Sequence, residues 1–376
     1  METTTLVIGG DLFPRDEQEL FAAGKCEKLF SKELLDLFSQ ADYSICNLEG
    51  ALTNAEEKTP KCGPSLKAPP ETIRGIRGLS LRCLALANNH VTDYGTQGYA
   101  DTVSALEENG IGYFGGGLNS NSIQTHISVS LNGKTFVIYA VSETVFNLPD
   151  ESTAGVNLYD EYRVCNELKE LKSRCDYLIV LYHGGAEYFR YPTPWIRQRF
   201  HRMADNGADI VIAQHTHCIG TEERYKGAYL LYGQGNFRFV QKDHPDLTNR
   251  GLLLEIAVSK DGYEVRRHLV TTVDGMTMLD PGQDLSDFEE RNERLARGET
   301  FEKEYSAYSE EWMTKWLVEF RGFKYLELLL RRLLPQKKFT AFLRRKYKDV
   351  TVLRMLEHVR GEEDVEVMIQ GLKDFY

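Results

Sequence analysis

The sequence predicts an α/β protein with a helical C-terminal appendage, and three observations lead to that prediction. From residue 4 to about residue 270, strand-like apolar runs alternate with helical stretches, as in helices packed over parallel or mixed sheets. From Tyr229 onward the strand-like runs follow one another without helices, so these late strands are expected to pair antiparallel. After about Asp274 the character changes, and from Leu285 to Tyr376 helix follows helix.

The expected strands are short, apolar and rich in β-branched residues. They cover residues 5–9, 43–48, 82–87, 136–141, 177–182, 210–213, 229–232, 252–258 and 264–270. Helices are expected at 17–39, 96–109, 161–173 and 194–206. Pro194 suits the first turn of the last of these, and Gly207 suits its end.

The chain is expected to divide into an α/β domain, residues 1–275, and a helical extension of unknown role, residues 276–376. Within the extension, an amphipathic helix is expected at 326–334, ended by Pro335. Residues 284–311 are acidic, whereas basic residues dominate 321–348. This contrast fits either a solvated appendage or a surface for anionic membrane lipid or a partner protein.

Composition excludes several classes of protein. The apolar fraction of 42% and the charged fraction of 27% are ordinary for a globular protein, and a net charge of -11 argues against a general nucleic-acid binder. No apolar run approaches the roughly 20 residues that span a bilayer, and the first residues are too polar for a signal peptide. The seven cysteines are scattered and form no CxxC pair. We therefore expect a reduced, cytoplasmic protein.

Five strand-like runs end in side chains that can bind a metal ion. These endings are Asp11, Glu49, Asn89-His90, His183 and His215-Thr216-His217. Because the ends of parallel strands meet at one edge of a sheet, these groups are expected to converge. Imidazole, amide and carboxylate ligands together suit Mn²⁺, Fe²⁺ or Zn²⁺, as one or two ions.

Each ending taken alone has a simpler explanation. Asp11 after two glycines is typical of a turn with an Asx hydrogen bond, and Asn88 can form a turn without any ligand role. A single histidine such as His183 is more often a hydrogen-bonded structural residue than a ligand. The joint occurrence of all five endings is what indicates a metal site.

The chain resembles the CapA (poly-γ-glutamate capsule biosynthesis) family, within the calcineurin-like metallophosphoesterase superfamily, over roughly residues 4 to 270. The matching segments are Gly9-Gly10-Asp11, Asn47-Leu48-Glu49-Gly50, Ala87-Asn88-Asn89-His90, Asp93-Tyr94-Gly95, Phe114-Gly115-Gly116-Gly117, His183-Gly184-Gly185, Glu187-Tyr188, Asn206-Gly207-Ala208-Asp209, His215-Thr216-His217 and Tyr232-Gly233-Gln234-Gly235-Asn236-Phe237.

This resemblance implies a four-layer α/β/β/α sandwich with a two-metal site. It implies that Asp11 and His217 hold the first metal, and that Asn89, His183 and His215 hold the second. Glu49 stands where the superfamily has a bridging aspartate, and His90 would be the catalytic histidine that is not a ligand. One departure is Phe13, which stands where the superfamily usually has a further histidine ligand, so the first metal loses a ligand.

Three functions are consistent with the sequence. The first is a metal-dependent hydrolase of the phosphoesterase type acting in capsule or peptide-polymer metabolism, since a bound divalent cation lowers the pKa of water to about 7. The second is a metal-dependent epimerase that inverts the Cα of a peptide's C-terminal residue, with His90 as base. The third is a non-catalytic, metal-stabilised partner in a polymer biosynthesis or export assembly.

Residues near the expected site are candidates for contact with an anionic or peptide-like substrate. They are Lys67, in a loop after the Glu49 strand, and Glu187, Tyr188 and Arg190, which follow His183 closely. Glu187, Tyr188 and Arg190 also have a second possible role, which is to orient His183. Lys67 is equally well explained as a solvated loop lysine.

Overall fold

The computed structural model describes residues 3–61, 63–144, 149–241 and 244–320, together with 333–335, 338, 342, 361 and 365–370. The chain forms two compact units. One unit comprises Met1–Thr59 and Ser65–Thr300, and the other comprises Pro60–Pro64 and Phe301–Tyr376. All of the predicted site residues belong to the first unit.

Two large sheets build the first unit. The first sheet has the order β18-β17-β16-β1-β2-β5-β6, with β15 beside β1. Its strands are β1 (Thr4–Leu12), β2 (Tyr43–Leu48), β5 (Cys83–Ala85), β6 (Gly112–Phe114), β15 (Asn236–Arg238), β16 (Arg250–Ser259), β17 (Gly262–Val273) and β18 (Met276–Leu279). The second sheet has the order β13-β14-β12-β11-β9-β8. Its strands are β8 (His126–Leu131), β9 (Lys134–Ser142), β11 (Tyr177–His183), β12 (Ile210–Gln214), β13 (Glu222–Tyr225) and β14 (Ala228–Leu231).

The two sheets pack face to face, because alternate residues of their strands join one apolar core. Ile138, Ile179 and Ile212 of the second sheet lie in the same buried cluster as Leu6 and Leu254 of the first. The intervening residues of the second sheet point outward.

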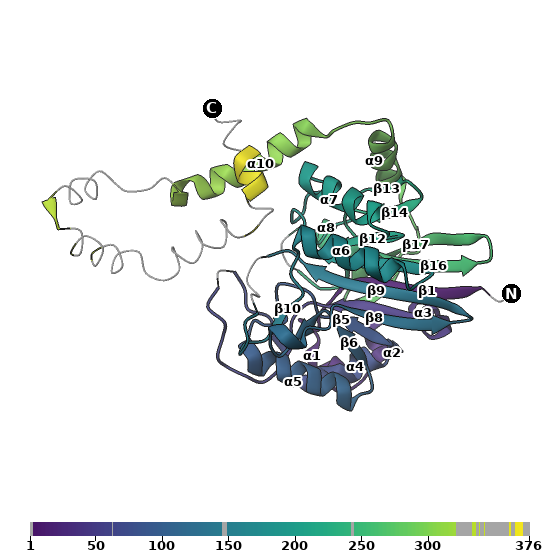
Figure 1. Cartoon of the computed structure of the whole chain (residues 1–376). Helices are drawn as coiled ribbons and strands as arrows, with labels where there is room; N and C mark the ends of the chain where they lie inside the picture. The colour runs from purple at the N-terminus through teal and green to yellow at the C-terminus, as the bar shows by residue number, and fades with distance from the viewer. Residues whose placement is uncertain are drawn as a thin grey trace. The chain divides into compact units, whose positions relative to one another are not determined.

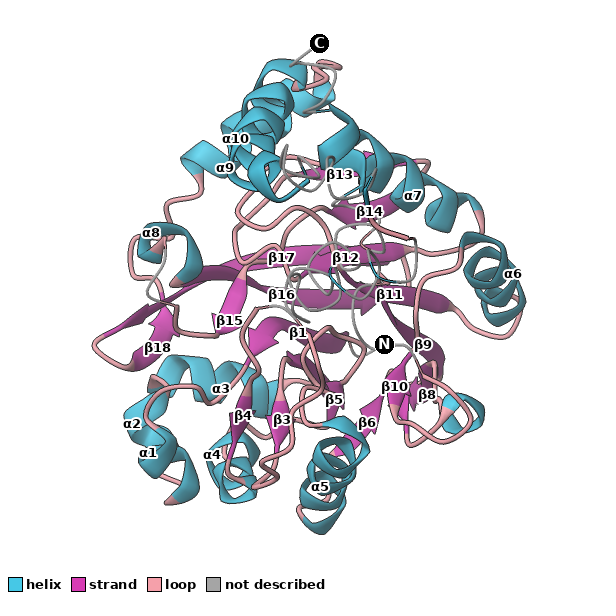
Figure 2. Ribbon diagram, turned by 90° about the vertical axis from the view of Figure 1, so that its left-hand side faces the viewer, coloured by secondary structure: helices cyan, strands magenta, loops and turns pink. Residues whose placement is uncertain are grey.

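Helices cover the outer face of each sheet (Figures 1 and 2). On the second sheet, Tyr139 donates a hydrogen bond to Glu167 of α6 (Glu161–Lys172). There too, Tyr182 packs edge-on against Phe200 of α7 (Pro194–Asp205). The first sheet is covered by α1 (Gln18–Ala22), α2 (Cys26–Leu29), α3 (Lys32–Gln40), α4 (Ile73–Arg77) and α5 (Gly95–Glu108). The predicted four-layer α/β/β/α sandwich is therefore confirmed.

The prediction of one helix over residues 17–39 was wrong. The segment forms the three short helices α1, α2 and α3. Gly24 breaks the first with a φ of 67°, a left-handed conformation that glycine adopts without strain. Phe30 is extended, and Ser31 begins a new helix by accepting a hydrogen bond from the Leu34 N–H.

The pairing of the late strands was predicted correctly only in part. β16 pairs antiparallel with both β1 and β17, as expected. β14, however, lies parallel to β12. Its antiparallel partner is β13, which the sequence analysis did not identify, and the turn between them contains Lys226 and Gly227, both with positive φ.

After residue 275 the chain continues with β18, α9 (Ser286–Ala296) and α10 (Glu302–Phe320). Most of the amphipathic helix expected at 326–334, and most of the basic stretch 321–348, lie outside the described residues. None of the described helices combines the length and the apolar character needed to cross a membrane.

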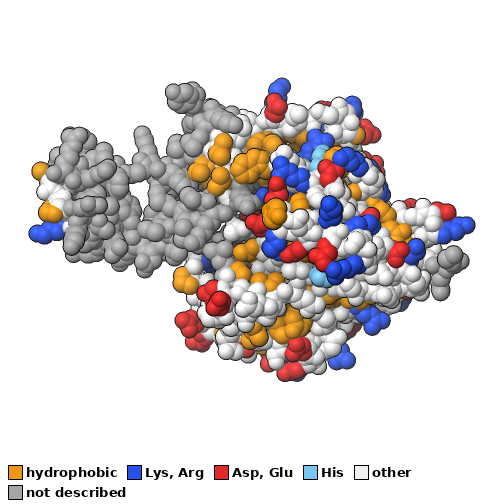
Figure 3. Space-filling view, in the orientation of Figure 1, with side chains coloured by type: hydrophobic (Ala, Val, Ile, Leu, Met, Phe, Trp, Pro, Cys, Tyr) orange, Lys and Arg blue, Asp and Glu red, His pale blue; other side chains and the backbone are white. Residues whose placement is uncertain are grey.

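Acidic and basic side chains are mixed on one face of the first unit. On the face shown in Figure 3, the two charge types are interspersed. On this face, the acidic excess of the sequence is not gathered into one patch.

Candidate metal centre

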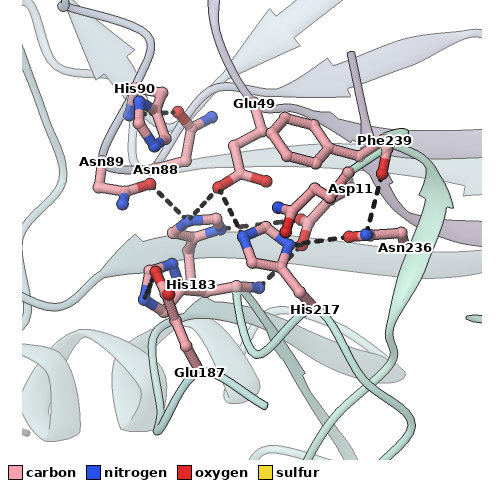
Figure 4. A network of polar contacts seen from close by, with 12 residues as sticks. Asp11, Glu49, Asn88, Asn89, His90, His183, Glu187, His217, Asn236 and Phe239 are labelled. Carbon is pink, nitrogen blue, oxygen red and sulfur yellow. Dashed lines mark hydrogen bonds and ion pairs between the residues drawn. The ribbon is translucent and has the colours of Figure 1, made fainter. Parts of the chain in front are cut away.

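The carboxyl ends of central strands from both sheets bring the predicted side chains together (Figure 4). In the first sheet, parallel pairing of β1 with β2 sets Asp11 opposite Asn47, two residues before Glu49. In the second sheet, parallel pairing of β11 with β12 sets His183 opposite Gln214, one residue before His215. These strands of the first sheet thus bring in the carboxylates of Asp11 and Glu49, and these strands of the second bring in the imidazoles of His183 and His215.

Glu49 lies at the centre of this group. Its side chain is fully buried, and its Oε1 lies 3.5 Å from Nε2 of His183 and 3.9 Å from Nε2 of His217. One ligand atom from each of Glu49, His215 and His217 lies within 4.8 Å of the others. Such separations allow these residues to share one cation, since metal–ligand bonds to nitrogen and oxygen are about 2.0–2.2 Å long.

Asp11 connects the two sheets. Its Oδ1 accepts a hydrogen bond of 2.7 Å from Nδ2 of Asn47, and its Oδ2 accepts one of 2.9 Å from the backbone N–H of His215. The same carboxylate lies 3.9 Å from Nδ1 of His183 and 3.8 Å from Nδ1 of His217. This carboxylate therefore fixes the start of the His215–His217 loop and adds negative charge beside two imidazoles.

His183 is held in one tautomer by two amides. Nδ2 of Asn47 lies 3.2 Å from its Nδ1, and Oδ1 of Asn89 lies 3.0 Å from its Nε2. Because the Asn47 nitrogen is a donor, Nδ1 accepts and Nε2 donates. Burial lowers the pKa of His183 to about 3, so the ring is neutral, as a metal ligand must be.

His217 faces Glu49 with a defined nitrogen. Nδ2 of Asn236 donates to the carbonyls of Phe239 and Thr248, which leaves its Oδ1 to accept from Nδ1 of His217 at 2.9 Å. Nε2 then lies on the side of Glu49. Burial acts to lower the pKa of His217, but the carboxylates of Glu49, Glu187 and Asp11 outweigh it and raise that pKa.

His215 provides the observation by which the site can be tested for a metal. The residue is buried, and its Nδ1 has no hydrogen-bond partner among the described residues. Its backbone has a φ of 91°, a strained value for a residue other than glycine. A buried imidazole nitrogen without a partner, on a residue grouped with Glu49 and His217 and held in a strained loop, fits a divalent cation of the Mn²⁺, Fe²⁺ or Zn²⁺ class.

His90 lies next to this group and is held by a carboxylate. Its Nδ1 lies 2.7 Å from Oδ2 of Asp93, and both side chains are buried. Asn88 accepts hydrogen bonds from the backbone N–H groups of His90 and Val91, which is the turn-forming role considered for it. Asn89, between them, contacts His183 as described above. The loop therefore places one amide on the metal group and one histidine beside it.

The residues proposed for substrate contact lie at different distances from the metal group. Glu187 lies 3.9 Å from Nε2 of His215, and the ring of Tyr188 lies 6.1 Å from that of His217, so both flank the centre. Lys67 donates to the carbonyl of Ala55, and its ammonium lies over the ring of Tyr94, the residue that follows Asp93.

Arg190 is not brought to the metal group. Its guanidinium pairs with Asp287 of α9 instead. Together with Arg250 and Arg291 it lines a separate cavity of about 90 Å³. Three residues beyond Glu187, the chain has already turned toward that helix.

Several residues at the centre were missed or underrated by sequence reasoning. Asn47 and Asn236 orient His183 and His217, and only their place in the strand-end motifs could have indicated this. Glu143 is 4% exposed and lies 3.9 Å from Nε2 of His215. A signal for it existed, because Glu143 also follows a strand-like run, at 136–141.

Phe13 occupies an apolar position beside the centre. It is buried, and its ring packs against Phe239, which in turn stacks on His217 at 5.1 Å between ring centroids. A phenyl ring offers no ligand atom, so this flank of the centre is closed by hydrocarbon.

Comparison with known proteins gives a family match over most of the first unit. The family model described as "Bacterial capsule synthesis protein PGA_cap" matches residues 5–241. "Capsule biosynthesis protein CapA" of Bacillus anthracis is 26% identical over 247 residues, which are 63% of this chain and 60% of that protein. "PGA biosynthesis protein CapA" of Bacillus subtilis is 29% identical over 209 residues, 54% of this chain and 55% of that protein. The chain thus spans between half and two thirds of the length of these relatives.

Solved structures of similar shape have low sequence identity. A protein from Thermus thermophilus, described as hypothetical, is 15% identical with a TM-score of 0.47, and the match covers 72% of this chain and all of that one. The NAD nucleotidase of Haemophilus influenzae is 12% identical with a TM-score of 0.45, covering 78% of this chain and 68% of that one.

Proposed function

The chain belongs to the PGA_cap family of bacterial capsule synthesis proteins, and on that premise we propose that it is a metal-dependent hydrolase with a phosphoesterase-type site. The observation that carries the proposal is the convergence of Glu49, His215 and His217, with one ligand atom of each within 4.8 Å of the others. Asp11, Asn89 and His183 complete the donor set.

The donor set supports Lewis-acid chemistry. When bound, a divalent cation would polarise an oxygen of the substrate and offset negative charge that builds on the attacked centre. To bind an ion, His183 would release the Nε2 proton that it donates to Asn89. Asn236 keeps His217 in the tautomer that leaves its Nε2 lone pair on the side of Glu49, and Asp11 fixes the loop that carries His215. Ligands so fixed need little rearrangement to take up an ion.

His90 is the proposed general acid. Asp93 accepts from Nδ1, which turns Nε2 into the nitrogen that can exchange a proton with the substrate. The Asp93 carboxylate also stabilises the positively charged ring. In the proposed step, His90 gives the proton on Nε2 to the leaving oxygen, and this type of assistance contributes about 10²- to 10⁴-fold in rate.

The proposed substrate class is an anionic or peptide-like molecule connected with capsule polymer. Support comes from the names of the relatives, which are capsule and PGA biosynthesis proteins. Lys67 begins the short strand β4 (Lys67–Ala68), where it lies opposite Ala51 of β3 (Ala51–Leu52), and its ammonium lies over the Tyr94 ring. It is the proposed cationic contact near His90.

Two assays on one preparation test the proposal. Purified protein is analysed for Mn, Fe and Zn, and then incubated with a chromogenic phosphodiester, with and without a chelator that is later removed. We expect metal in the protein, hydrolysis that the chelator abolishes, and recovery when the metal is restored. The His90→Asn variant should keep the metal but lose about 10²- to 10⁴-fold in kcat.

A second incubation, in D₂O with short peptides, separates hydrolysis from epimerisation. Deuterium uptake at a C-terminal Cα without cleavage would replace the hydrolase by the epimerase. If metal binds but neither reaction occurs, and His90→Asn has no effect on capsule formation in cells, the protein is a non-catalytic partner.

A further inference from the structure

We infer that Glu143 is a positioning residue of the metal centre, which holds His215 so that its Nδ1 is directed to the cation. This inference rests on the proposed function, because it assigns a role toward the metal proposed there. Four features of the chain support it.

The fold places Glu143 at the centre by backbone pairing. β9 lies parallel to β11 with Ser142 opposite His183, and the backbone N–H of Glu143 donates to the carbonyl of His183 at 3.0 Å. Glu143 is therefore one step beyond the same sheet edge from which His183 projects. The same backbone pairing therefore fixes the positions of both Glu143 and His183.

Space for the Glu143 carboxyl group is provided by Gly184. A Cβ atom at position 184 would lie 2.8 Å from both Cδ and Oε2 of Glu143, closer than real Cβ contacts allow. Any other residue at 184 would displace the carboxyl group or the ring of Tyr182, whose Cε1 lies at the same distance from that Cβ position. The glycine after His183 thus serves the placement of a buried acid, a role that the sequence alone does not reveal.

The two ring nitrogens of His215 have different surroundings, since two carboxylates lie near Nε2 and Nδ1 has no hydrogen-bond partner among the described residues. Oε1 of Glu143 and Oε1 of Glu187 each lie 3.9 Å from Nε2 of His215. Nδ1 of the same ring is buried without a hydrogen-bond partner in the described structure. Negative charge beside Nε2 favours the tautomer with its proton there, which leaves the Nδ1 lone pair for a metal ion.

Glu143 and Glu187 differ in burial, and the difference indicates that Glu143 is the carboxylate with the stronger effect on His215. Glu143 is 4% exposed, whereas the side chain of Glu187 is 48% exposed. A distance of 3.9 Å is an electrostatic contact rather than a hydrogen bond, so a small shift or one bridging water completes it. A buried carboxylate acts through a less screened medium than an exposed one, so Glu143 has the larger effect on the ring.

The test measures metal affinity in the full chain, without any substrate. Mn²⁺ is titrated into chelator-treated protein by calorimetry for the wild type and for Glu143→Gln. Loss of a carboxylate that orients a metal-binding histidine typically costs roughly 10- to 100-fold in affinity, and we expect that loss here. Glu143→Asp, which keeps the charge, should recover part of it. In the Zn²⁺ form, ¹⁵N spectra of the histidines should show His215 protonated at Nε2 in the wild type and a mixture of tautomers in Glu143→Gln.

Glu223→Gln is the matched control. Glu223 also lies beside a histidine, His201, but on β13 and outside the metal group. Its replacement should leave the Mn²⁺ affinity unchanged while lowering stability.

The outcomes separate this inference from the proposed function. If the wild type takes up no metal, both fail. If Glu49→Gln abolishes binding but Glu143→Gln binds Mn²⁺ like the wild type with an unchanged His215 spectrum, Glu143 has no positioning role and the metal site stands. If Glu143→Gln does not fold, Glu143→Asp replaces it in the test. The shorter Asp side chain places the carboxylate farther from His215, so this variant should still bind Mn²⁺ more weakly than Glu223→Gln does.

Discussion

The two flanks of the candidate metal centre differ in chemistry. Beside His217 lie Phe13 and Phe239, which present hydrocarbon. Beside His215 lie the carboxylates of Glu143 and Glu187. Glu49 lies between the two flanks.

The histidines on the two flanks also differ in their affinity for a proton. The pKa of His215 is lowered by burial, with a further lowering from His183, whereas that of His217 is raised by Glu49, Glu187 and Asp11 against the effect of its burial. The flank with a neutral, oriented imidazole is better prepared for a cation than the flank closed by aromatic rings. A centre with one firmly held ion, on the His215 flank, is the expectation to be tested.

The largest effect is expected from Glu49→Gln, because Glu49 serves both flanks. Replacement of a central carboxylate by a neutral amide should lower Mn²⁺ affinity by more than the roughly 100-fold seen for outer partners of a ligand. Calorimetric titration of the variant measures it. A loss no larger than that of Glu143→Gln would show that Glu49 is not a ligand.

Phe13→His should make the two flanks more alike. A new imidazole near Asp11 and His217 adds a donor where the wild type has none, so the variant should bind an additional ion per chain. Metal analysis after dialysis measures this, with Phe13→Leu as a control that changes the ring but adds no donor. The loss of stability should be about 1–3 kcal/mol, since a buried apolar ring is replaced by a polar one. Equal metal content in the two variants would contradict the idea.

The lowered pKa of His183 predicts a pH dependence for the metal-free protein. The ring takes up a proton at about pH 6.5 in the unfolded chain but only at about pH 3 in the folded one. The unfolded state therefore binds more protons between these values, and stability falls as the pH drops through this window, by up to about 1.4 kcal/mol per pH unit for this group.

Urea unfolding in the presence of a chelator, at several pH values, measures the effect. His183→Gln should show a shallower dependence on pH than the wild type. His217, whose pKa is raised, acts in a different window: above about pH 6.5 the folded state holds the proton longer than the unfolded chain, so stability falls as the pH rises there, and His217→Gln should remove that fall while leaving the slope at lower pH unchanged. Identical slopes for the three proteins would exclude titration of these histidines as the cause.

The smallest effect is expected at Arg190, which pairs with Asp287 away from both flanks. Arg190→Gln should leave metal affinity unchanged and alter stability by less than about 1 kcal/mol, as for other partly exposed ion pairs. Asp287→Asn is the companion variant and should behave alike. A marked loss of metal from Arg190→Gln would mean that the cavity beside α9 is coupled to the centre.

The positions of several strands could be predicted from the local sequence. The central strands were placed to within a few residues, and β2 was placed at its observed bounds. Short, mostly apolar runs of this kind are typical of strands in a sheet that is covered on both faces. The helix at 17–39 was misplaced because its amphipathic pattern continues across Gly24, while the backbone there turns out of the helix.

The sequence by itself determined which side chains stand at the ends of strands, since apolar runs and the polar residues that end them are local features. Only the tertiary structure decided which of these ends face one another. Parallel register set Glu143 beside His183, the meeting of two sheets set Glu49 between His183 and His217, and a turn toward α9 took Arg190 away. Such neighbours lie dozens of residues apart in the chain, and their contact depends on how layers pack, which a local pattern does not encode.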